Sequence, residues 1–403
     1  MIIKRFLLWS RTAPPAQRAA AIGALCRAYV DGELELNDRF EAETAMTAML
    51  DDASPLVRRA VAEALADAAE APRHVVLGLA SDQSDIAATV LARSPLLADP
   101  DLVDCVAIGD DLVQTAVARR RDVSAAVSGA LAEIGGAEAV TALLDNRGAM
   151  ISDGSLSRIV DRLGSDATVR EALLARDDLP LDIRQAVAHA LSRSLAAFVA
   201  ECGWLSPERS ERATREAREK TTVDLSGVAR ANDVRRLVSH LRTSAQLTPA
   251  LILRALLSRA LPFAEAAFAD LSGLPVKRVS RLMQDRHGSG FTALYRRAGL
   301  PDRLRPAFAA AVAATRRHEA GQPGLPQLSR RVIADTLMAC ATLPARDGAA
   351  ITALLRRYDV EAAREEAREL AGVLADEAAL APILRHMPEL IEDELRPERL
   401  LAA

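Results

Sequence analysis

Side chains that catalyse reactions or bind metals are scattered along this sequence. The histidines are His74, His189, His240, His287, His318 and His386, and the cysteines are Cys26, Cys105, Cys202 and Cys340. No histidine has a second histidine or a cysteine three or four residues away, whereas a zinc site needs about four ligands in fixed geometry. The cysteines have neither paired metal spacing nor the density of a disulfide framework, which fits a reducing compartment.

The sequence motifs that mark common active sites are also absent. No G-x-G-x-x-G, G-x-x-x-x-G-K-[ST] or G-x-S-x-G pattern occurs, so neither a phosphate-binding loop nor a nucleophile elbow is indicated. We therefore expect a protein that is not an enzyme and that has no metal site and no cofactor.

The most specific binding pattern lies at residues 267–286, AFADLSGLPVKRVSRLMQDR. It has the form of a helix-turn-helix, with Gly273 in the turn and with Val279 and Leu282 facing inward. It resembles the recognition unit of Lac-type repressors, whose second helix enters the major groove of DNA. Pro275 departs from that pattern, because such motifs often carry a polar capping residue there.

The resemblance implies a set of outward-facing polar side chains. They are Lys277, Arg278, Ser280 and Arg281, with Arg286, Arg296 and Arg297 as additional phosphate contacts. Arginine can bind guanine through two hydrogen bonds, and lysine and serine can bind phosphate. Helix pairs with a glycine turn are nevertheless common in α-proteins, and basic residues on exposed helices are usually solvated. DNA binding is therefore the alternative function.

A second basic cluster consists of Arg119, Arg120 and Arg121, at the end of a helical segment. Cations there interact favourably with the helix dipole, by a few tenths of a kcal/mol each. Contact with a ligand is the other interpretation.

The modest net charge of −4 conceals strong segregation. Residues 31–112 contain 18 acidic and 5 basic residues, a net charge of −13. Residues 271–331 contain 12 basic and 3 acidic residues, a net charge of +9, and residues 359–403 carry a net charge of −7. Such asymmetry affects association and leaves the fold unspecified.

The composition predicts an all-α fold. Half of the residues are apolar but only 3% are aromatic, so the apolar half is mainly Ala, Leu and Val. Ala and Leu lose little or no rotamer freedom in a helix, whereas sheets are richer in Tyr, Phe, Thr and Ile.

Five segments repeat one pattern of residue types. They are SPLVRRAVAEAL from Ser54, SDIAATVLA from Ser84, DLVQTAVARR from Asp111, DVSAAVSGAL from Asp122 and DIRQAVAHAL from Asp182. Each opens with Ser or Asp, which can cap a helix, and continues with apolar residues at helical spacing. Successive starts differ by 30 residues between Ser54 and Ser84 and by 27 between Ser84 and Asp111.

A unit of about 30 residues cannot bury its apolar face alone, so neighbouring units must stack. We therefore expect a HEAT-like helical-repeat solenoid followed by a C-terminal helical bundle, with Ala64 and Ala126 on buried faces. The alternating acids and bases of residues 206–220 suit a solvated connector. The expected parts are a HEAT-like repeat domain at 1–204, a charged helical connector at 205–245, and an α-helical domain with a basic segment and an acidic tail at 246–403.

Several phrases of the sequence resemble one family. They are APRHVVLGLASD, SPLLADPDLVDCV, VQTAVARRRDVSAAVSGALAE, LLDNRGAMIS, FAEAAFADLSGLP and GFTALYRRAGLP. They are similar to an alphaproteobacterial HEAT-like family known as a domain of unknown function, from about Leu50 to Leu343. The resemblance implies a helical-repeat fold in a bacterial cytoplasm, without an activity, a cofactor or a catalytic residue.

The first function that we expect is a protein-binding adaptor or scaffold that uses a helical-repeat surface. Its partner is a protein or a second copy of the chain, and the basic segment at 271–331 can meet an acidic arm. The N-terminal apolar run is only four residues, Phe6 to Trp9, shorter than the roughly 7–15 of an export signal. No stretch approaches the ~18 apolar residues of a membrane span, so we expect a cytoplasmic location.

Overall fold

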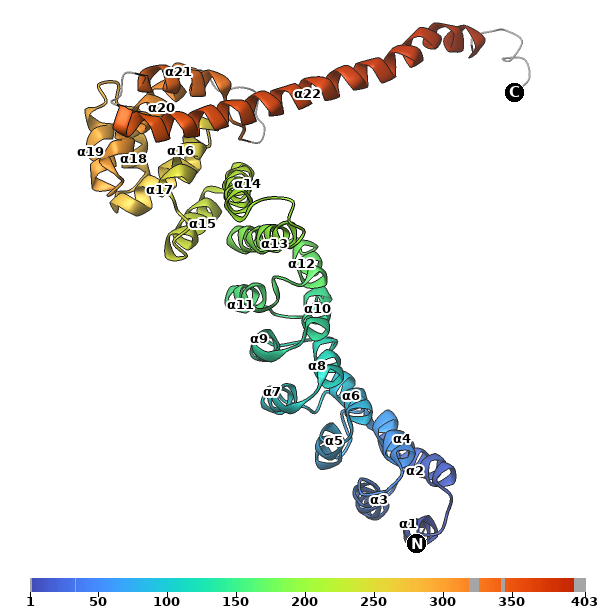
Figure 1. Cartoon of the computed structure of the whole chain (residues 1–403). Helices are drawn as coiled ribbons and strands as arrows, with labels where there is room; N and C mark the ends of the chain where they lie inside the picture. The colour runs from blue at the N-terminus through green and yellow to red at the C-terminus, as the bar shows by residue number, and fades with distance from the viewer. Residues whose placement is uncertain (1, 33, 319–325, 342–344, 395–403) are drawn as a thin grey trace. The chain divides into compact units, whose positions relative to one another are not determined.

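The computed structural model describes residues 2–32, 34–318, 326–341 and 345–394. These residues form twenty-two α-helices and one short 3₁₀ helix, and their only β-type pairing is an isolated bridge between Val123 and Ala149 (Figure 1). The all-α prediction is confirmed.

The chain divides into two compact units, Met1–Thr214 (unit 1) and Arg215–Ala403 (unit 2). The boundary lies inside α14 (Pro207–Gly227), within the segment expected to be a connector. Another part of that segment, α15 (Ala231–Thr243), packs against α17 and buries an apolar face that includes Leu237. Unit 2 therefore begins about thirty residues before the expected domain start at residue 246.

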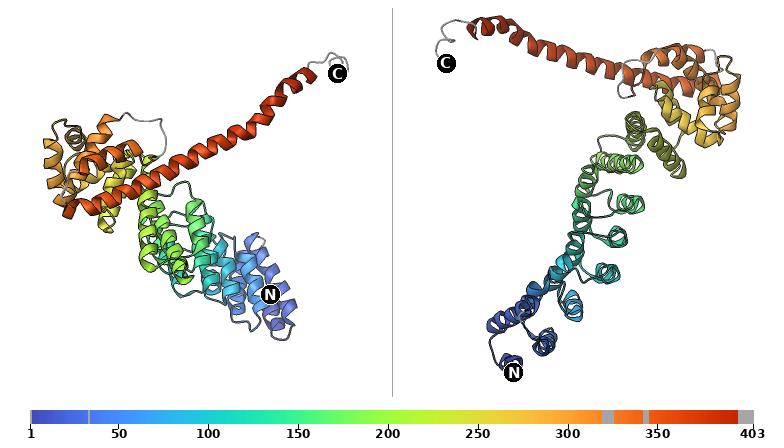
Figure 2. Two further views of the ribbon diagram at one scale, coloured as in Figure 1. Left: turned by 45° about the horizontal axis from the view of Figure 1, so that its top comes forward. Right: turned by 180° about the vertical axis from the view of Figure 1, so that it is seen from behind.

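The described part of unit 1 contains thirteen whole helices. They are α1 (Ile2–Ser10), α2 (Pro15–Val30), α3 (Leu36–Met49), α4 (Pro55–Leu65), α5 (Arg73–Ala80), α6 (Ser84–Arg93), α7 (Asp99–Ile108), α8 (Asp111–Ala118), α9 (Ala125–Ile134), α10 (Ala137–Asp145), α11 (Asp153–Leu163), α12 (Ala167–Leu174) and α13 (Leu181–Glu201). Helices α2, α4, α6, α8, α10 and α12 pack successively in one layer, and α7, α9, α11 and α13 in the other. Figure 2 shows the same two layers from behind.

The apolar rows of the repeats form the interior of unit 1. In α4, Val57, Val61 and Leu65 are fully buried, whereas Leu56 is 47% exposed. Ala64 is half-buried against this core. The prediction for Ala126 is wrong, because this residue is exposed. Helix α9 begins at Ala125 instead of Asp122, and this start turns Val127 and Leu131 inward.

Glycines mark the same turn in three consecutive repeats. Gly109, Gly135 and Gly164 follow the last residues of α7, α9 and α11, at intervals of 26 and 29 residues. The backbone N–H of each donates to a carbonyl four residues earlier. A Cβ atom at Gly135 would lie 2.5 Å from the carbonyl oxygen of Leu131, so the close return of the chain requires glycine.

Polar side chains connect each repeat to the one before it. The guanidinium of Arg120, which follows α8, donates to the carbonyls of Leu91 and Ser94 at the end of α6. Asn146, after α10, donates to the carbonyl of Ala118 at 2.8 Å. Arg176, after α12, donates to that of Leu144 at 2.9 Å. These reach-back residues satisfy carbonyls that a helix leaves free at its C-terminal end.

Unit 2 begins with the second part of α14. Its further helices are α15, α16 (Pro249–Leu257), α17 (Leu261–Ser272), α18 (Val276–Met283), α19 (Ser289–Arg297), the 3₁₀ helix η1 (Asp302–Leu304), α20 (Arg305–Arg317), α21 (Arg330–Cys340) and α22 (Ala345–Glu394). An aromatic cluster joins α17, α19 and α20: the Phe268 ring lies 5.6 Å from Phe291 and 6.2 Å from Phe308, between centroids. The last residues of the acidic tail, 395–403, lie outside the described residues.

Candidate binding surfaces

Two helices joined by a glycine turn form the segment for which a helix-turn-helix was expected. Helix α17 ends at Ser272, Gly273 has φ +68°, and α18 begins at Val276. A left-handed conformation after the helix favours glycine, because it lacks a Cβ atom. Pro275 occupies the capping position and, as expected, supplies no side-chain hydrogen bond.

Helix α18 separates its buried and exposed residues sharply. Val279 and Met283 are buried, and Leu282 is half-buried. Ser280 is half-buried as well, whereas the three basic residues Lys277, Arg278 and Arg281 are exposed. The outward placement expected for these cations is therefore present, and Ser280 lies at the border of their face.

The neighbouring arginines differ in their contacts. Arg286 and Arg296 are exposed. Arg297 is exposed too, but its Nε donates to the carbonyl of Ser272 at 2.8 Å, and this bond closes the end of α17. The carboxylate of Asp285 accepts from the backbone N–H groups of His287 and Gly290, and these bonds hold its pKa below the ordinary value.

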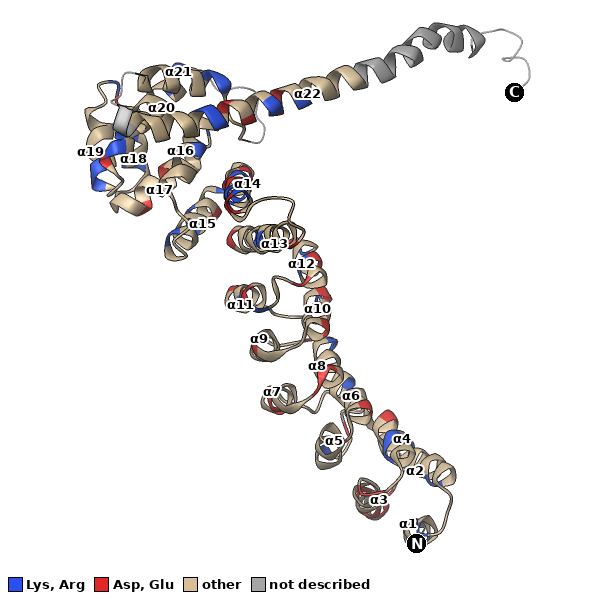
Figure 3. Cartoon of the chain, in the orientation of Figure 1, with Lys and Arg blue, Asp and Glu red and all other residues tan. Residues whose placement is uncertain are grey.

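We call five of the six exposed cations of this region, all except Arg297, the basic face: Lys277, Arg278, Arg281, Arg286 and Arg296. Within the described residues none of them forms an ion pair, unlike many arginines of unit 1. Figure 3 colours Lys and Arg blue, and blue segments of the ribbon lie in α18 and α19. From α17 to α19, no large apolar side chain is exposed. The basic face therefore offers positive charge and hydrogen-bond donors without an apolar centre.

The Arg119–Arg121 cluster is divided among different environments. Arg120 is one of the reach-back residues, and its guanidinium lies on carbonyls at the end of α6 instead of its own helix. Burial lowers its pKa. Arg119 and Arg121 are exposed. Arg119 also lines an open cavity of about 690 Å³ with Glu138 and Asp145.

A different surface follows the turns after α5, α7, α9 and α11, which we call the turn edge. The Ser84 hydroxyl donates to Asp110 Oδ2 at 2.6 Å, and the Gly136 N–H donates to Gln114 Oε1 at 3.1 Å. These bonds place the turns of successive repeats side by side. The sequence patterns did not single out this surface.

Large aliphatic side chains are exposed along the turn edge. Ile108 is 86% exposed, Leu112 is 49% exposed, and Ile134, at the position equivalent to Ile108 in the next repeat, is 44% exposed. The carboxylates of Asp111 and Glu138 flank them and are exposed too. The turn edge therefore combines apolar area with negative charge.

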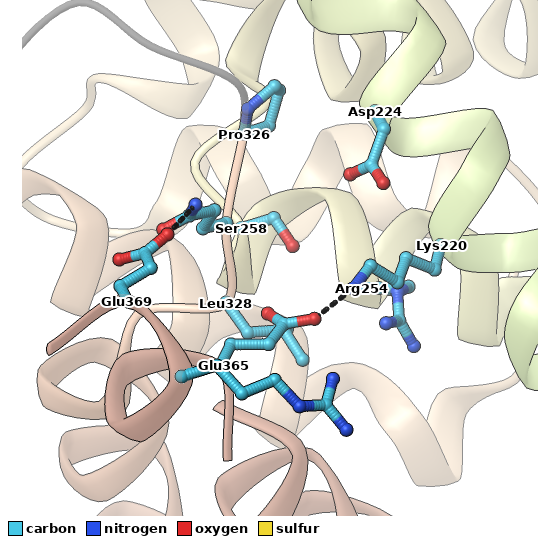
Figure 4. A pocket seen from close by; sticks show the side chains of 10 residues that line it. Lys220, Asp224, Arg254, Ser258, Pro326, Leu328, Glu365 and Glu369 are labelled. Carbon is cyan, nitrogen blue, oxygen red and sulfur yellow. Dashed lines mark hydrogen bonds and ion pairs between the residues drawn. The ribbon is translucent and has the colours of Figure 1, made fainter. Parts of the chain in front are cut away.

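Unit 2 also contains a polar cavity of about 260 Å³. Lys220, Asp224, Arg254, Ser258, Pro326, Leu328, Glu365 and Glu369 are among its lining residues (Figure 4). The Arg254 side chain is only 2% exposed, forms an ion pair with Glu361 and lies 5.2 Å from the centre of the Tyr358 ring. Lys220 pairs with Glu365.

This charge cluster holds α14, α16 and α22 together. Burial raises the pKa values of Glu219 and Asp224. The one sequence signal for the cluster is a lone arginine inside an apolar run, LILRALL at 251–257. No spacing rule connects Arg254 with Glu361, because they are 107 residues apart.

Metal sites and membrane spans are two further possibilities that the described residues address. These residues contain no group of three or more His, Cys, Asp or Glu side chains arranged to hold a metal ion. No helix in this part of the chain combines the length and apolar character that crossing a membrane requires.

Comparison with known proteins identifies the family. Neither the curated proteins nor the solved structures contain a significant match to the chain. A family model described as "Uncharacterised protein conserved in bacteria (DUF2336)" matches residues 86–346. This range covers the second part of the unit 1 layers together with α14 to α21. Because the match extends over more than half of the sequence, the chain belongs to this bacterial family.

Proposed function

We propose that the chain is a non-enzymatic adaptor whose unit 1, a HEAT-like repeat array, holds a protein partner on its turn edge. The observation that carries the proposal is the row of exposed aliphatic side chains, above all Ile108 at 86% exposure. Fully burying an aliphatic side chain of this size contributes roughly 1.5–3 kcal/mol. An exposed apolar row rimmed by polar groups is typical of protein-binding surfaces.

The charge of the turn edge indicates the chemistry of the partner. Asp111 and Glu138 are exposed beside the aliphatic row. A partner with an apolar anchor and nearby Lys or Arg residues complements this arrangement, because opposite potentials speed encounter and exclude other partners. Isoleucine at two equivalent positions suits a partner that extends over two repeats.

A cytoplasmic location is part of the proposal. All four cysteines are free in the structure, which fits a reducing compartment.

The test places a photo-crosslinking amino acid at Ile108 or Ile134 and irradiates cells that make the protein. Met150 and Leu174 are matched controls, because they are 62% and 49% exposed but lie outside the turn edge. We expect one protein adduct from both test positions and none from the controls. Nuclease treatment before purification excludes adducts bridged by nucleic acid.

The captured partner is then purified and titrated against wild-type protein and the variant Ile108→Ser/Ile134→Ser. A loss of affinity of at least about tenfold is expected, since two buried aliphatic anchors are removed. Equal affinity for both proteins, or adducts that form equally at Met150 and Leu174, would contradict the proposal.

A further inference from the structure

The exposed side chains of α18, and that of Gln284 directly after it, are either positively charged or polar and uncharged. Lys277, Arg278, Arg281 and Gln284 are exposed, and the half-buried Ser280 borders them. Each can donate a hydrogen bond. Residues 276–284 contain no carboxylate. The carboxylate of Asp285, which follows them, accepts hydrogen bonds from the backbone N–H groups of the next turn.

This chemistry differs from that of a protein-binding surface. The central residues of protein interfaces are mainly aromatic or aliphatic, with arginine among them. Between α17 and α19 no large apolar side chain is exposed. A partner whose surface is dense in negative charge and hydrogen-bond acceptors fits better. Duplex DNA has both, as phosphates along its backbone and as acceptors on base edges in the major groove.

We propose that unit 2 binds double-stranded DNA through the basic face, with α18 in the major groove. Lys277, Arg278 and Arg281 lie on the inserted helix. Arg286, in the next turn, and Arg296, on α19, contact the flanking backbone. This inference is independent of the adaptor proposal, because it concerns a different unit and a different set of residues.

The dimensions of α18 agree with this partner. An α-helix with its side chains has a diameter of about 10–12 Å. The major groove of B-DNA is about 12 Å wide and admits one helix. The major groove of A-form RNA is deep and narrow, and side chains cannot read it. The same helix therefore favours DNA over duplex RNA.

Buried contacts hold α18 in a fixed position. Val279 is fully buried and Met283 is 4% exposed. The adjoining helices α17 and α19 contact each other through the rings of Phe268 and Phe291, which pack edge to face. Arg297 closes the end of α17 through the Ser272 carbonyl, so it is a positioning residue for the helix pair instead of a phosphate contact.

The test is a fluorescence-anisotropy titration of the full chain against a labelled DNA duplex of mixed sequence. We expect binding at about 50 mM salt that weakens steeply towards about 200 mM, by roughly 0.9 log units per log salt for each phosphate contacted. The variant Lys277→Ala/Arg278→Ala/Arg281→Ala should lose more than about tenfold in affinity at a fixed salt concentration.

A matched control removes the same amount of charge from unit 1. Arg193, Arg209 and Arg212 are exposed, and their joint replacement by Ala should leave DNA affinity within about twofold of the wild-type value, if binding is local to unit 2. Circular dichroism and thermal melting check that both triple variants fold. Should the alanine variant unfold, the same three positions are changed to Gln, which keeps helix propensity.

Several results would overturn the proposal. Wild-type protein that does not bind duplex DNA at about 50 mM salt is one. Equal loss in the control and test variants is another, because it indicates a general response to net charge. Equal or tighter binding of duplex RNA, or competition by polyglutamate at matched charge, would show that the basic face binds another class of polyanion.

Discussion

At the scale of the residue, Gly273 sets the geometry of α17 and α18 through its backbone alone. Its φ is +68°, and apart from Gly273 and its two chain neighbours no described residue has an atom within 4 Å of the place where a Cβ atom would stand. A substitution therefore meets conformational strain without a steric clash. At Gly135 the reverse holds, since the constraint is the carbonyl of Leu131.

We expect Gly273→Ala to lower the free energy of unfolding by about 1–2 kcal/mol, the cost of a left-handed conformation for an L-residue. Urea unfolding followed by circular dichroism measures the change. Gly372→Ala is the control, because Gly372 lies inside α22 and a Cβ atom there would have open space around it; alanine at this position should be neutral or stabilising. A Gly273→Ala variant as stable as wild type would contradict the strain argument.

The different burial of Ala64 and Ala126 gives a second prediction. Ala64→Asp places a carboxylate against the core of unit 1, where it loses hydration without a partner. Thermal melting should show strong destabilisation, on the order of a few kcal/mol. Ala126 is exposed, so Ala126→Asp should change stability by no more than about 0.5 kcal/mol. Similar losses in both variants would mean that α9 is rotated from the position described.

At the scale of the element, apolar periodicity predicted the presence of the helices more accurately than their first residues. The segment expected to start at Asp122 forms α9 from Ala125, because the Ser124 hydroxyl accepts from the Val127 N–H and caps it instead. At Asp111 the capping side chain is that of Asp110. Neighbouring Ser and Asp residues compete for the same position, and sequence alone does not rank them.

The basic helix of unit 2 was predictable, but its supports were not. The spacing of Val279 within an otherwise polar segment indicates which side of α18 is buried. The bond from Arg297 to Ser272 depends on how α19 packs, and 25 residues separate the two. The turn edge was not predicted either. Its exposed residues are aliphatic, like the residues that the stacking of the repeats buries, so residue type alone does not distinguish the two groups.

The docking of α22 depends on a buried cation. Arg254 pairs with Glu361 and faces the Tyr358 ring, whose hydroxyl lies 3.4 Å from Glu219. Arg254→Met leaves the Glu361 carboxylate without its ion-pair partner, and breaking a buried pair costs about 3–5 kcal/mol. Glu361 is 29% exposed, so we expect a loss near the lower end of that range. Hydrogen exchange in residues 351–362 should rise.

The comparison for this prediction is Arg357→Met. The Arg357–Glu216 pair has a separation of 3.4 Å and side-chain exposures of 45% and 33%. Such exposed pairs contribute about 0–1 kcal/mol. The double change Arg254→Met/Glu361→Leu should recover part of the lost stability, because it removes both buried charges. Equal effects of the two arginine variants would refute the special role of Arg254.

At the scale of the whole molecule, acid should act mainly on unit 1, although Asp285 in unit 2 also has a lowered pKa. Hydrogen bonds from Ser84 and Thr168 hold the pKa values of Asp110 and Asp166 in unit 1 below their ordinary values. Their stabilising contribution is present above the unfolded value near 3.8 and is lost as the pH falls through the folded value. Glu219 in unit 2 has a raised pKa, so its contribution is present at low pH and is lost as the pH rises.

Unit 1 should therefore melt at lower temperature as the pH falls below about 4. Tryptophan fluorescence reports this selectively, because both tryptophans, Trp9 and Trp204, lie in unit 1. The variant Asp110→Asn/Asp166→Asn should show a weaker dependence on pH. A fluorescence melting temperature that stays constant between about pH 5 and pH 3 would contradict the prediction.

The segregated charges also predict association at low salt. Segments with net charges of −13, +9 and −7 attract their counterparts on other copies until salt screens them over about 10 Å at ~0.1 M. Light scattering should give an average mass above the 43.1 kDa of one chain at low salt, and a lower mass at about 0.3 M. Changing Lys277, Arg278 and Arg281 to Glu should reduce the association. A mass independent of salt would exclude electrostatic self-association.

The reach-back residues connect the repeats of unit 1 in one direction and at a regular spacing. Arg120, Asn146 and Arg176 each serve the helix end of the preceding repeat, and they stand 26 and 30 residues apart. The free carbonyls at the end of each repeat are therefore bound by a side chain of the repeat that follows it. If the array is truncated after a repeat, that repeat loses these hydrogen bonds. Deleting one whole repeat leaves each reach-back residue opposite an equivalent helix end. Deleting half a repeat places the next reach-back residue away from any such helix end. The array can therefore gain or lose length only in whole repeats.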